Sequence, residues 1–342
     1  MKKCPSNGRA YARFRFSLAL LALLLIVASL NLGASCSGSD KKNTTAGSSE
    51  DNSTSTLWTA KASMPTARAG HAIAMVNDKL YVIGGYGSNG VFLGTNEEYD
   101  PVSNTWTTKA SMPTPRQSFI LAVVNNKIYA IGGFTAPTTV SAVNEEYDPV
   151  SNTWTSKAVM PTARGSLAGG VVNDKIYAIG GFAVSPPFMA PVATNEEYDP
   201  ASNSWATKTF APTVILSFAI GVVNNKIYAI GGSDGATEFN TNIRYDPGTN
   251  QWGYMTSMTT ARGFFAAGVA NNKIYAIGGE LGVNRLATNE EYDPASNTWA
   301  SKPNMPAPRN ELAIGVVDNT IYAIGGFNNA DGYLTANTAY KP

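Results

Sequence analysis

The chain has 342 residues, of which 44% are hydrophobic, and this content is enough for a large buried core and excludes a disordered polypeptide. The formal net charge is +1, but residues 1–36 hold five basic residues and no acidic ones, which leaves 20 basic and 24 acidic side chains in residues 37–342. Because phosphate binding needs a basic surface, this balance excludes nucleic acid from the partners we expect.

Residues 1–36 have the layout of an export signal. Residues 1–15 are basic, residues 16–30 are apolar, and small residues then lead to Cys36. Residues 32–36, Leu-Gly-Ala-Ser-Cys, resemble a bacterial lipobox, in which the cysteine is acylated. We therefore expect export across a bacterial inner membrane and lipidation of Cys36, which would hold the protein at the outer membrane or cell surface. The alternatives are ordinary cleavage, giving a periplasmic or secreted protein, and a retained signal helix.

Residues 37–56 consist of Ser, Thr, Asn and Gly with scattered charges, and they are too polar to bury a core. We interpret them as a flexible tether. Cys4 and Cys36 are the only cysteines, so residues 37–342 can form no disulfide and offer no thiolate for catalysis or metal binding. The stability of this part must come from packing and strand pairing.

From residue 57 onward the chain repeats itself with a period near 50 residues. Both markers of the repeat keep the same spacing: the tryptophans Trp58, Trp106, Trp154, Trp205, Trp252 and Trp299, and the Gly-Gly pairs that begin at Gly84, Gly132, Gly180, Gly231, Gly278 and Gly325. A repeat of this length with several strands per unit indicates the blades of a β-propeller.

Each unit has the same order of motifs. In residues 112–154 this order is Met-Pro-Thr, an arginine, an apolar run, two asparagines, KIYAIGG, a variable loop, NEEYDP and SNTW. Alternating residues in KIYAI predict a strand, and the two asparagines predict a tight hairpin before it. The double glycine, Tyr-Asp-Pro and tryptophan resemble the kelch repeat over residues 57–342. The resemblance implies an all-β fold, a six-bladed kelch propeller.

The ends of the repeat predict how the ring closes. One tryptophan precedes the first Gly-Gly pair, and none follows the last pair. The chain therefore supplies five whole blades, three strands in residues 311–340, and a separate strand around Trp58. We expect this N-terminal strand to close the last blade, which would remove both free sheet edges and leave a monomer.

Two further series have structural interpretations. Arginine recurs before the first strand of each unit and glutamate recurs before the repeated tyrosine, whereas unit four has Ile215 and Ile243 at these positions. Because unit four lacks both the arginine and the glutamate, we expect these two residues to form an ion pair within each blade that has them. His71, the only histidine, occupies a position that is Phe or Leu in the other units, so we expect it to be structural.

The loops that follow the Gly-Gly pairs differ most between units, and variable loops on a rigid scaffold are where binding sites are built. They and the arginine segments should share one rim. The candidate binding residues there are Tyr86, Phe134, Phe182, Glu238, Asn284, Phe327, Asn328 and Asp331. Their aromatic rings could stack on a sugar or a peptide, or could cap the blades. Polar exceptions in units four to six supply weak catalytic candidates, which no motif identifies: Glu280, Glu311, Asp234 and Arg285.

The leading hypothesis is an exported, membrane-anchored module that binds a protein or a glycan through this rim, with no cofactor and no metal. The first alternative is a metal-free carbohydrate enzyme, because sialic-acid mutarotases look like exported kelch propellers and need only proton donors and acceptors. Galactose oxidase resembles this fold too, but its copper chemistry needs histidines and a cysteine that residues 37–342 lack. The second alternative is a structural surface protein.

Overall fold

The computed structural model describes residues 57–342 except residues 89, 186 and 187. The predicted signal, Cys36 and tether therefore lie outside the described residues. No helix that is long and apolar enough to cross a membrane occurs in the part of the chain that the structure describes.

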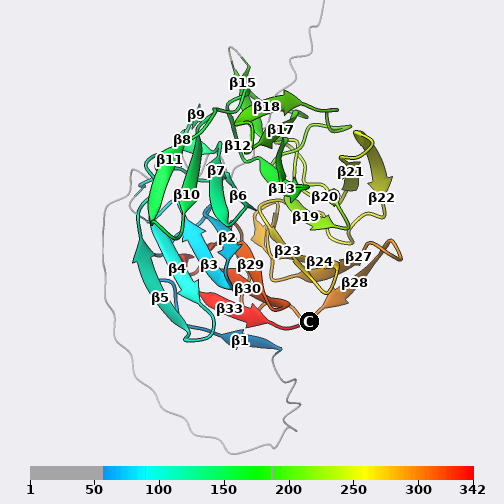
Figure 1. Cartoon of the computed structure of the whole chain (residues 1–342). Helices are drawn as coiled ribbons and strands as arrows, with labels where there is room; N and C mark the ends of the chain where they lie inside the picture. Colours follow the sequence, from blue (N-terminus) through cyan, green and yellow to red (C-terminus); the bar gives the residue numbers. More distant parts are fainter. Residues whose placement is uncertain (1–56, 89, 186–187) are drawn as a thin grey trace, which may run out of the picture.

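Six four-stranded antiparallel sheets, counted over the described residues, are arranged around a central axis (Figure 1). The innermost strands are β2 (Ala72–Val76), β6 (Ile120–Val124), β13 (Ala168–Val172), β19 (Ala219–Val223), β23 (Ala266–Ala270) and β29 (Ala313–Val317). Each contacts the innermost strand of the next sheet, and β29 contacts β2, so the ring is closed.

The other strands follow in order toward the outside. The second strands are β3 (Lys79–Ile83), β7 (Lys127–Ile131), β14 (Lys175–Ile179), β20 (Lys226–Ile230), β24 (Lys273–Ile277) and β30 (Thr320–Ile324). The third strands are β4 (Asn96–Asp100), β10 (Asn144–Asp148), β17 (Asn195–Asp199), β21 (Asn242–Asp246), β27 (Asn289–Asp293) and β33 (Asn337–Tyr340). The outer strands are β5 (Thr105–Lys109), β11 (Thr153–Ser156), β18 (Ser204–Thr207), β22 (Gln251–Met255), β28 (Thr298–Lys302) and β1 (Trp58–Ala60).

Short strands at one rim extend the loops that follow the Gly-Gly pairs. They are β8 (Phe134–Ala136), β9 (Thr139–Val140), β15 (Phe182–Ser185), β16 (Phe188–Pro191), β25 (Glu280–Leu281), β26 (Asn284–Arg285), β31 (Phe327–Asn328) and β32 (Gly332–Tyr333). A further short strand, β12 (Arg164–Gly165), lies in the arginine segment of the third unit and pairs with β15. The residue after each Gly-Gly pair is bridged to the segment after the arginine position of the same unit, as in Ala69 and Tyr86. The prediction that these two segments share a rim is confirmed.

The repeated residues explain the geometry of each sheet. Asn77 and Asp78 have φ angles of 50° and 58°, which suit the tight turn between β2 and β3. The innermost strands use small residues because they crowd together around the axis. A Cβ atom added to Gly169 of β13 would lie 2.8 Å from a side-chain carbon of Ile120 in β6.

The N-terminal strand closes the last sheet, as predicted. Strand β1 pairs with β33 in antiparallel register, with Trp58 opposite Tyr340, and the two rings stack with centroids 5.0 Å apart. The indole Nε1 of Trp58 donates a hydrogen bond to the carbonyl of Pro303 at 2.9 Å, as the indole of Trp154 does to Ala110 in the second sheet. The outer strand of the sixth sheet thus makes the same strand pairing and indole hydrogen bond as the outer strands of sheets that are continuous in sequence.

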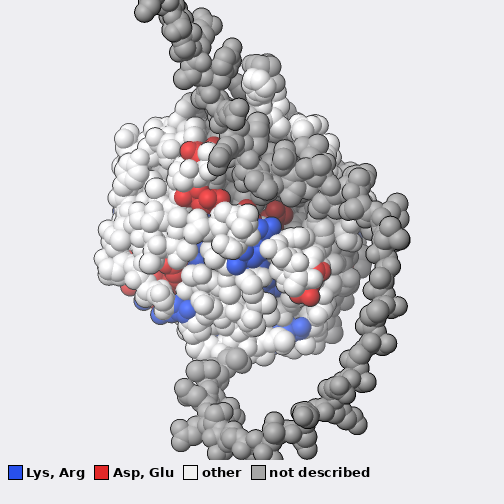
Figure 2. All heavy atoms as spheres, turned by 180° about the vertical axis from the view of Figure 1, so that it is seen from behind, with Lys and Arg blue, Asp and Glu red and all other residues white. Residues whose placement is uncertain are grey.

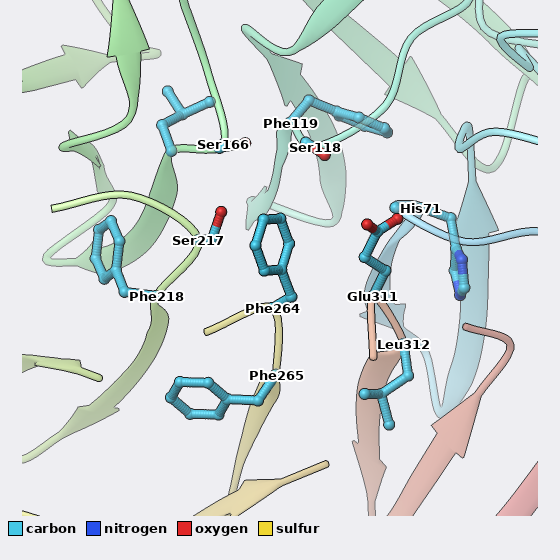
Figure 3. A pocket seen from close by; sticks show the side chains of 12 residues that line it. His71, Ser118, Phe119, Ser166, Ser217, Phe218, Phe264, Phe265, Glu311 and Leu312 are labelled. Carbon is cyan, nitrogen blue, oxygen red and sulfur yellow. The ribbon is translucent and has the colours of Figure 1, made fainter. Parts of the chain in front are cut away.

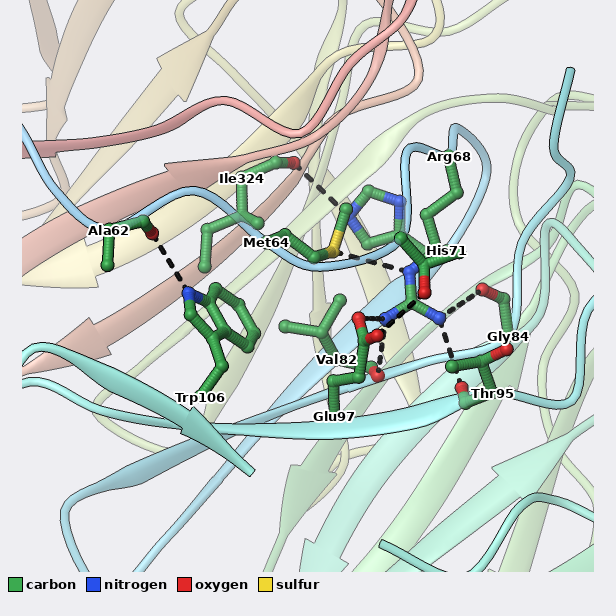
Figure 4. Close-up of polar contacts among 11 residues, drawn as sticks. Ala62, Met64, Arg68, His71, Val82, Gly84, Thr95, Glu97, Trp106 and Ile324 are labelled. Carbon is green, nitrogen blue, oxygen red and sulfur yellow. Dashed lines mark hydrogen bonds and ion pairs between the residues drawn. The ribbon is translucent and has the colours of Figure 1, made fainter. Parts of the chain in front are cut away.

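The predicted ion pairs within a sheet are confirmed, and they are buried. Arg68 contacts Glu97 at 2.5 Å and also donates to the carbonyls of Val82, Gly84 and Thr95 (Figure 4). Equivalent pairs are Arg116–Glu145, Arg164–Glu196 and Arg262–Glu290, at 2.7–2.8 Å. These arginines tie the segment that enters each sheet to its second and third strands.

Two sheets depart from this arrangement. In the fourth sheet Ile215 and Ile243 replace both partners, and both side chains are fully buried. In the sixth sheet Arg309 is buried but has Thr338 in place of the acid, with 2.6 Å between its Nη2 and the Thr338 Oγ1. Burial lowers the pKa of Arg309 to about 10, and no acidic group among the described residues offsets this effect. The sixth sheet therefore holds a buried charge without a counter-charge.

We expect Thr338→Glu to stabilise the protein. Thr338 is opposite Ala323, the register that Glu145 has opposite Ala130, so the new carboxylate would reach the Arg309 guanidinium. The gain at pH 7 should be about 1–3 kcal/mol in the free energy of unfolding, measured by denaturant titration. The matched control is Ile243→Glu, which places the same acid in the apolar cluster that holds Ile215 and should destabilise the protein. Equal effects of the two variants would contradict this account.

Candidate functional site

Six residues with left-handed backbone conformation surround the axis at the rim that carries the variable loops. Each lies two positions after the repeated arginine or, in the fourth sheet, after Ile215, and each has a φ angle between 51° and 63°. We call them the axial ring: Gly70, Ser118, Ser166, Ser217, Phe264 and Glu311.

A circle of backbone hydrogen bonds holds the axial ring together. The N–H of each member donates to the carbonyl of the member in the preceding sheet, at 2.8–3.0 Å. The circle is completed where the N–H of Gly70 donates to the carbonyl of Glu311 at 2.9 Å. Because the main chains bond to one another, the side chains are left to line the axis.

The axial ring surrounds a cavity of about 150 Å³, which we call the axial pocket. The residues that follow the ring members complete its wall: His71, Phe119, Leu167, Phe218, Phe265 and Leu312. The side chains of Ser118, Ser217, Phe264 and Glu311 lie around the space (Figure 3). The hydroxyl of Ser217 is buried and has no hydrogen-bond partner among the described residues.

Two members of the axial ring are not small. Gly and Ser occupy four of the six positions, whereas Phe264 and Glu311 are neighbours with φ angles of 53° and 51°. A bulky side chain is uncommon in the left-handed region, and such a conformation costs on the order of 1 kcal/mol. The scaffold therefore holds an aromatic ring and a carboxyl group at the axis although smaller residues would fit there more easily.

The carboxyl group of Glu311 titrates near neutral pH. Burial, with a smaller contribution from the negative charge of Glu280, raises the pKa of Glu311 to about 7, although the Arg285 guanidinium acts against this shift. Among the described residues, Asn310 and Arg285 direct their polar contacts to Glu280 and not to Glu311. Glu311 can therefore exchange a proton, or accept a bond from a ligand, close to physiological pH.

Glu280 and Arg285 form a pair beside the axial pocket. Glu280 is buried, and its Oε2 lies 3.1 Å from Arg285 Nη1 and accepts a hydrogen bond from Asn310 Nδ2 at 2.7 Å. Burial raises the pKa of Glu280, and the charge of Glu238 adds to this rise. Arg285 also lies over the ring of Phe327, 5.6 Å from its centroid.

The aromatic candidates pack mainly against one another and against the scaffold. Tyr86 packs edge-on against Phe92, its ring centroid lies 5.9 Å from that of Tyr333, and Phe327 contacts Tyr333 as well. Phe134 is buried against Gly165 of the next sheet. Phe182 is half-buried and pairs with Gly165.

The polar candidates of the loops are separated. Asp234 accepts hydrogen bonds from two backbone N–H groups of its own turn, and Asn328 and Asp331 bond to each other. Asn284 is exposed at the tip of the hairpin between β25 and β26. The structure thus brings Glu280, Glu311, Arg285 and Phe327 together near the axis, with the charge of Glu238 within range of Glu280.

Sequence reasoning did not single out the ring members other than Glu311. The sequence does contain a signal for the other members. The position two residues after the repeated arginine changes from Gly to Ser, Phe and Glu between units, although the residues before it are similar. The ring members converge because they adopt the left-handed backbone conformation, and the residue types Ser and Phe do not predict that conformation.

Where grey atoms do not cover the face that Figure 2 shows, charged side chains are sparse. Acidic and basic groups lie side by side near its middle, and most of the other visible surface carries neither. Over residues 57–342 as described, no three His, Cys, Asp or Glu residues form a group that could hold a metal ion.

Comparisons with known proteins identify the repeat. The model of the KLHDC2/KLHL20/DRC7 kelch-repeats domain matches residues 44–181, and the kelch motif model matches residues 163–208, 216–259 and 261–306. The chain therefore contains a kelch-repeat domain, which implies a β-propeller. No curated protein matches the chain.

Solved structures show that the fold is widespread, since 923 chains match. The structure of YjhT is similar, with a TM-score of 0.70 and 16% sequence identity over 80% of this chain and 95% of that one. At this identity the likeness shows the fold alone, and function must be argued from the site.

We expect His71 to make the stability of the protein depend on pH. Its Nε2 lies 3.1 Å from the Ile324 carbonyl oxygen, its Nδ1 has no hydrogen-bond partner among the described residues, and burial, aided by the charges of Arg68 and Arg309, lowers the pKa of His71 to about 3. Below pH 6.5 the unfolded chain binds a proton that the folded protein does not, so stability falls by up to ~1.4 kcal/mol per pH unit toward pH 3.

We expect His71→Phe to remove this dependence, because Phe119, Phe218 and Phe265 occupy the same position in other sheets. The melting temperature of the variant should exceed that of the parent by an amount that grows as the pH falls from 7 to 5. The matched control, Leu312→Phe, leaves His71 in place and should retain the parent's slope. A parallel pH profile for His71→Phe would contradict the assignment.

Proposed function

We propose that this kelch-repeat domain belongs to an exported, membrane-anchored protein and acts as a binding module for a protein or glycan ligand. The observation that supports this proposal concerns one position of the repeat, the one that forms the axial ring. At the axial ring, where small residues fit with least strain, the chain carries Phe264 and Glu311 beside a cavity. Repeated residues build the scaffold, and this departure from the repeat gives the ligand a place to bind.

The aromatic rim extends the contact surface beyond the pocket. Burial raises the pKa of Tyr333 to about 12, and the Glu311 charge contributes, so the Tyr86–Tyr333–Phe327 cluster lies close to the pocket. A ligand that inserts one group at the axis would contact these partly exposed rings with its remainder. Exposed aromatic surface of this kind suits both sugar faces and apolar peptide side chains.

Binding can be tested with glycan and peptide arrays. We expect the full-length protein to bind a limited set of ligands and the double variant Phe264→Ser, Glu311→Ser to lose them, because this variant gives the ring the serine found in three other sheets. The matched control is Asp318→Asn, which introduces the asparagine of other units at an exposed turn. Binding that survives in the double variant, or no binding to either array, would contradict the proposal; the latter would favour a structural surface protein.

A metal-free carbohydrate enzyme such as a sialic-acid mutarotase is the second candidate. The observation in its favour is Glu311, whose pKa of about 7 suits a general acid or base, beside the Glu280–Arg285 pair. For any sugar that binds, NMR exchange between anomers would decide. Exchange no faster than in buffer would remove the enzymatic role while leaving the binding role intact.

The membrane anchor is proposed from the lipobox resemblance at Cys36. We expect Cys36→Ala to move the protein from the membrane fraction to the soluble fraction of fractionated cells, since the acylated thiol would be gone. The control is Cys4→Ala, which removes the other cysteine and should leave the protein attached. Attachment that persists in Cys36→Ala would indicate a retained signal helix.

A further inference from the structure

Resting on the binding function proposed above, we propose that the ligand presents a primary ammonium group on a short apolar stem, which enters the axial pocket beside Phe264 and Glu311. Both side chains lie at the same pocket and come from neighbouring sheets (Figure 3). An aromatic face attracts a cation through its quadrupole, and a carboxylate adds a charge-assisted hydrogen bond. An anion would be repelled by the Glu311 carboxylate, and a neutral hydroxyl group would gain no cation–π attraction from Phe264.

The charges around the pocket favour a cation. Glu311 is faced by Glu280 and Arg285 from the hairpin of the fifth sheet, by Tyr333 from the sixth and by His71 from the first. His71 is neutral, and Arg285 is bound to Glu280 and stacked on Phe327. Arg285 therefore offsets one acid, while Glu311 is left without a paired cation.

The remaining wall suits an ammonium group with a stem. Three serine hydroxyls line the pocket with lone pairs that can accept from N–H donors, and Ser217 Oγ is buried without a partner among the described residues. Below the ring, Phe119, Phe218 and Phe265 provide apolar surface for methylene groups. Polar groups and apolar surface thus meet within one cavity.

The size of the pocket limits the ligand. A volume of about 150 Å³ is close to that of an engineered cavity that holds benzene, so it accommodates about five or six heavy atoms. A lysine side chain or a free alkylamine has this size. These two sources share the same chemistry, and the experiment below separates them.

The test is an NMR titration of the full-length protein with n-butylammonium chloride, 1-butanol and sodium butyrate at pH 8. We expect shifts at the axial ring amides only with n-butylammonium, with a dissociation constant on the order of millimolar. Glu311→Ser should weaken binding roughly tenfold or more and Phe264→Ser roughly threefold to tenfold, while Asp318→Asn has no effect. Between pH 6 and pH 8 the affinity should rise roughly tenfold as Glu311 ionises.

Peptides complete the test. A lysine peptide that binds more tightly than n-butylammonium identifies a protein ligand, and equal affinity identifies a free amine. Butanol binding as tight as n-butylammonium, no response at all, or full affinity in a folded Glu311→Ser variant would overturn the inference. If the array ligands lack a cation but still need the axial ring, the inference fails and the binding function stands. If neither arrays nor amines bind, both fail.

Discussion

The pairing of β1 with β33 is the interaction on which the molecule depends. The first and last sheets belong to opposite ends of the described chain, and this pairing is the strand-to-strand link that joins those ends. The circle of hydrogen bonds in the axial ring crosses the same seam, where Gly70 donates to Glu311. The seam is therefore closed at its outer edge by β1, where Trp58 and Tyr340 stack, and at the axis by the Gly70–Glu311 hydrogen bond.

A strongly repeated scaffold allows strain at a few positions. Four buried arginine–glutamate pairs and the indole hydrogen bonds fix the sheets in nearly identical geometry. This rigidity holds Phe264 and Glu311 in a backbone conformation that neither residue favours. Glu311 belongs to the sixth sheet, which also contains the buried Arg309 charge, so one of the two sheets that depart from the repeated ion pair contributes the carboxyl group of the site.

The scaffold could be predicted from the sequence because each repeated residue has the same structural role in successive units. The count of tryptophans and Gly-Gly pairs predicted the Trp58 strand, and the joint replacement at Ile215 and Ile243 predicted the ion pairs, although not their burial. The site was only partly predictable: Glu280, Glu311 and Arg285 do converge, whereas Asp234 bonds within its own turn. Position in a variable loop does not determine side-chain direction, and the axial ring depends on φ angles that its residue types do not reveal.

The central claim, that strand β1 holds the axial ring in place, is tested most directly by hydrogen exchange in Trp58→Ala. Removing a buried indole should cost about 3–5 kcal/mol. The account predicts faster exchange in β33 and at the amides of Gly70 and Glu311, on either side of the seam, with a smaller change at Ser166 and Ser217 across the ring. If the Gly70 and Glu311 amides keep the exchange protection of the parent protein while the β33 amides lose theirs, the axial ring does not depend on the β1–β33 pairing. That result would contradict the account.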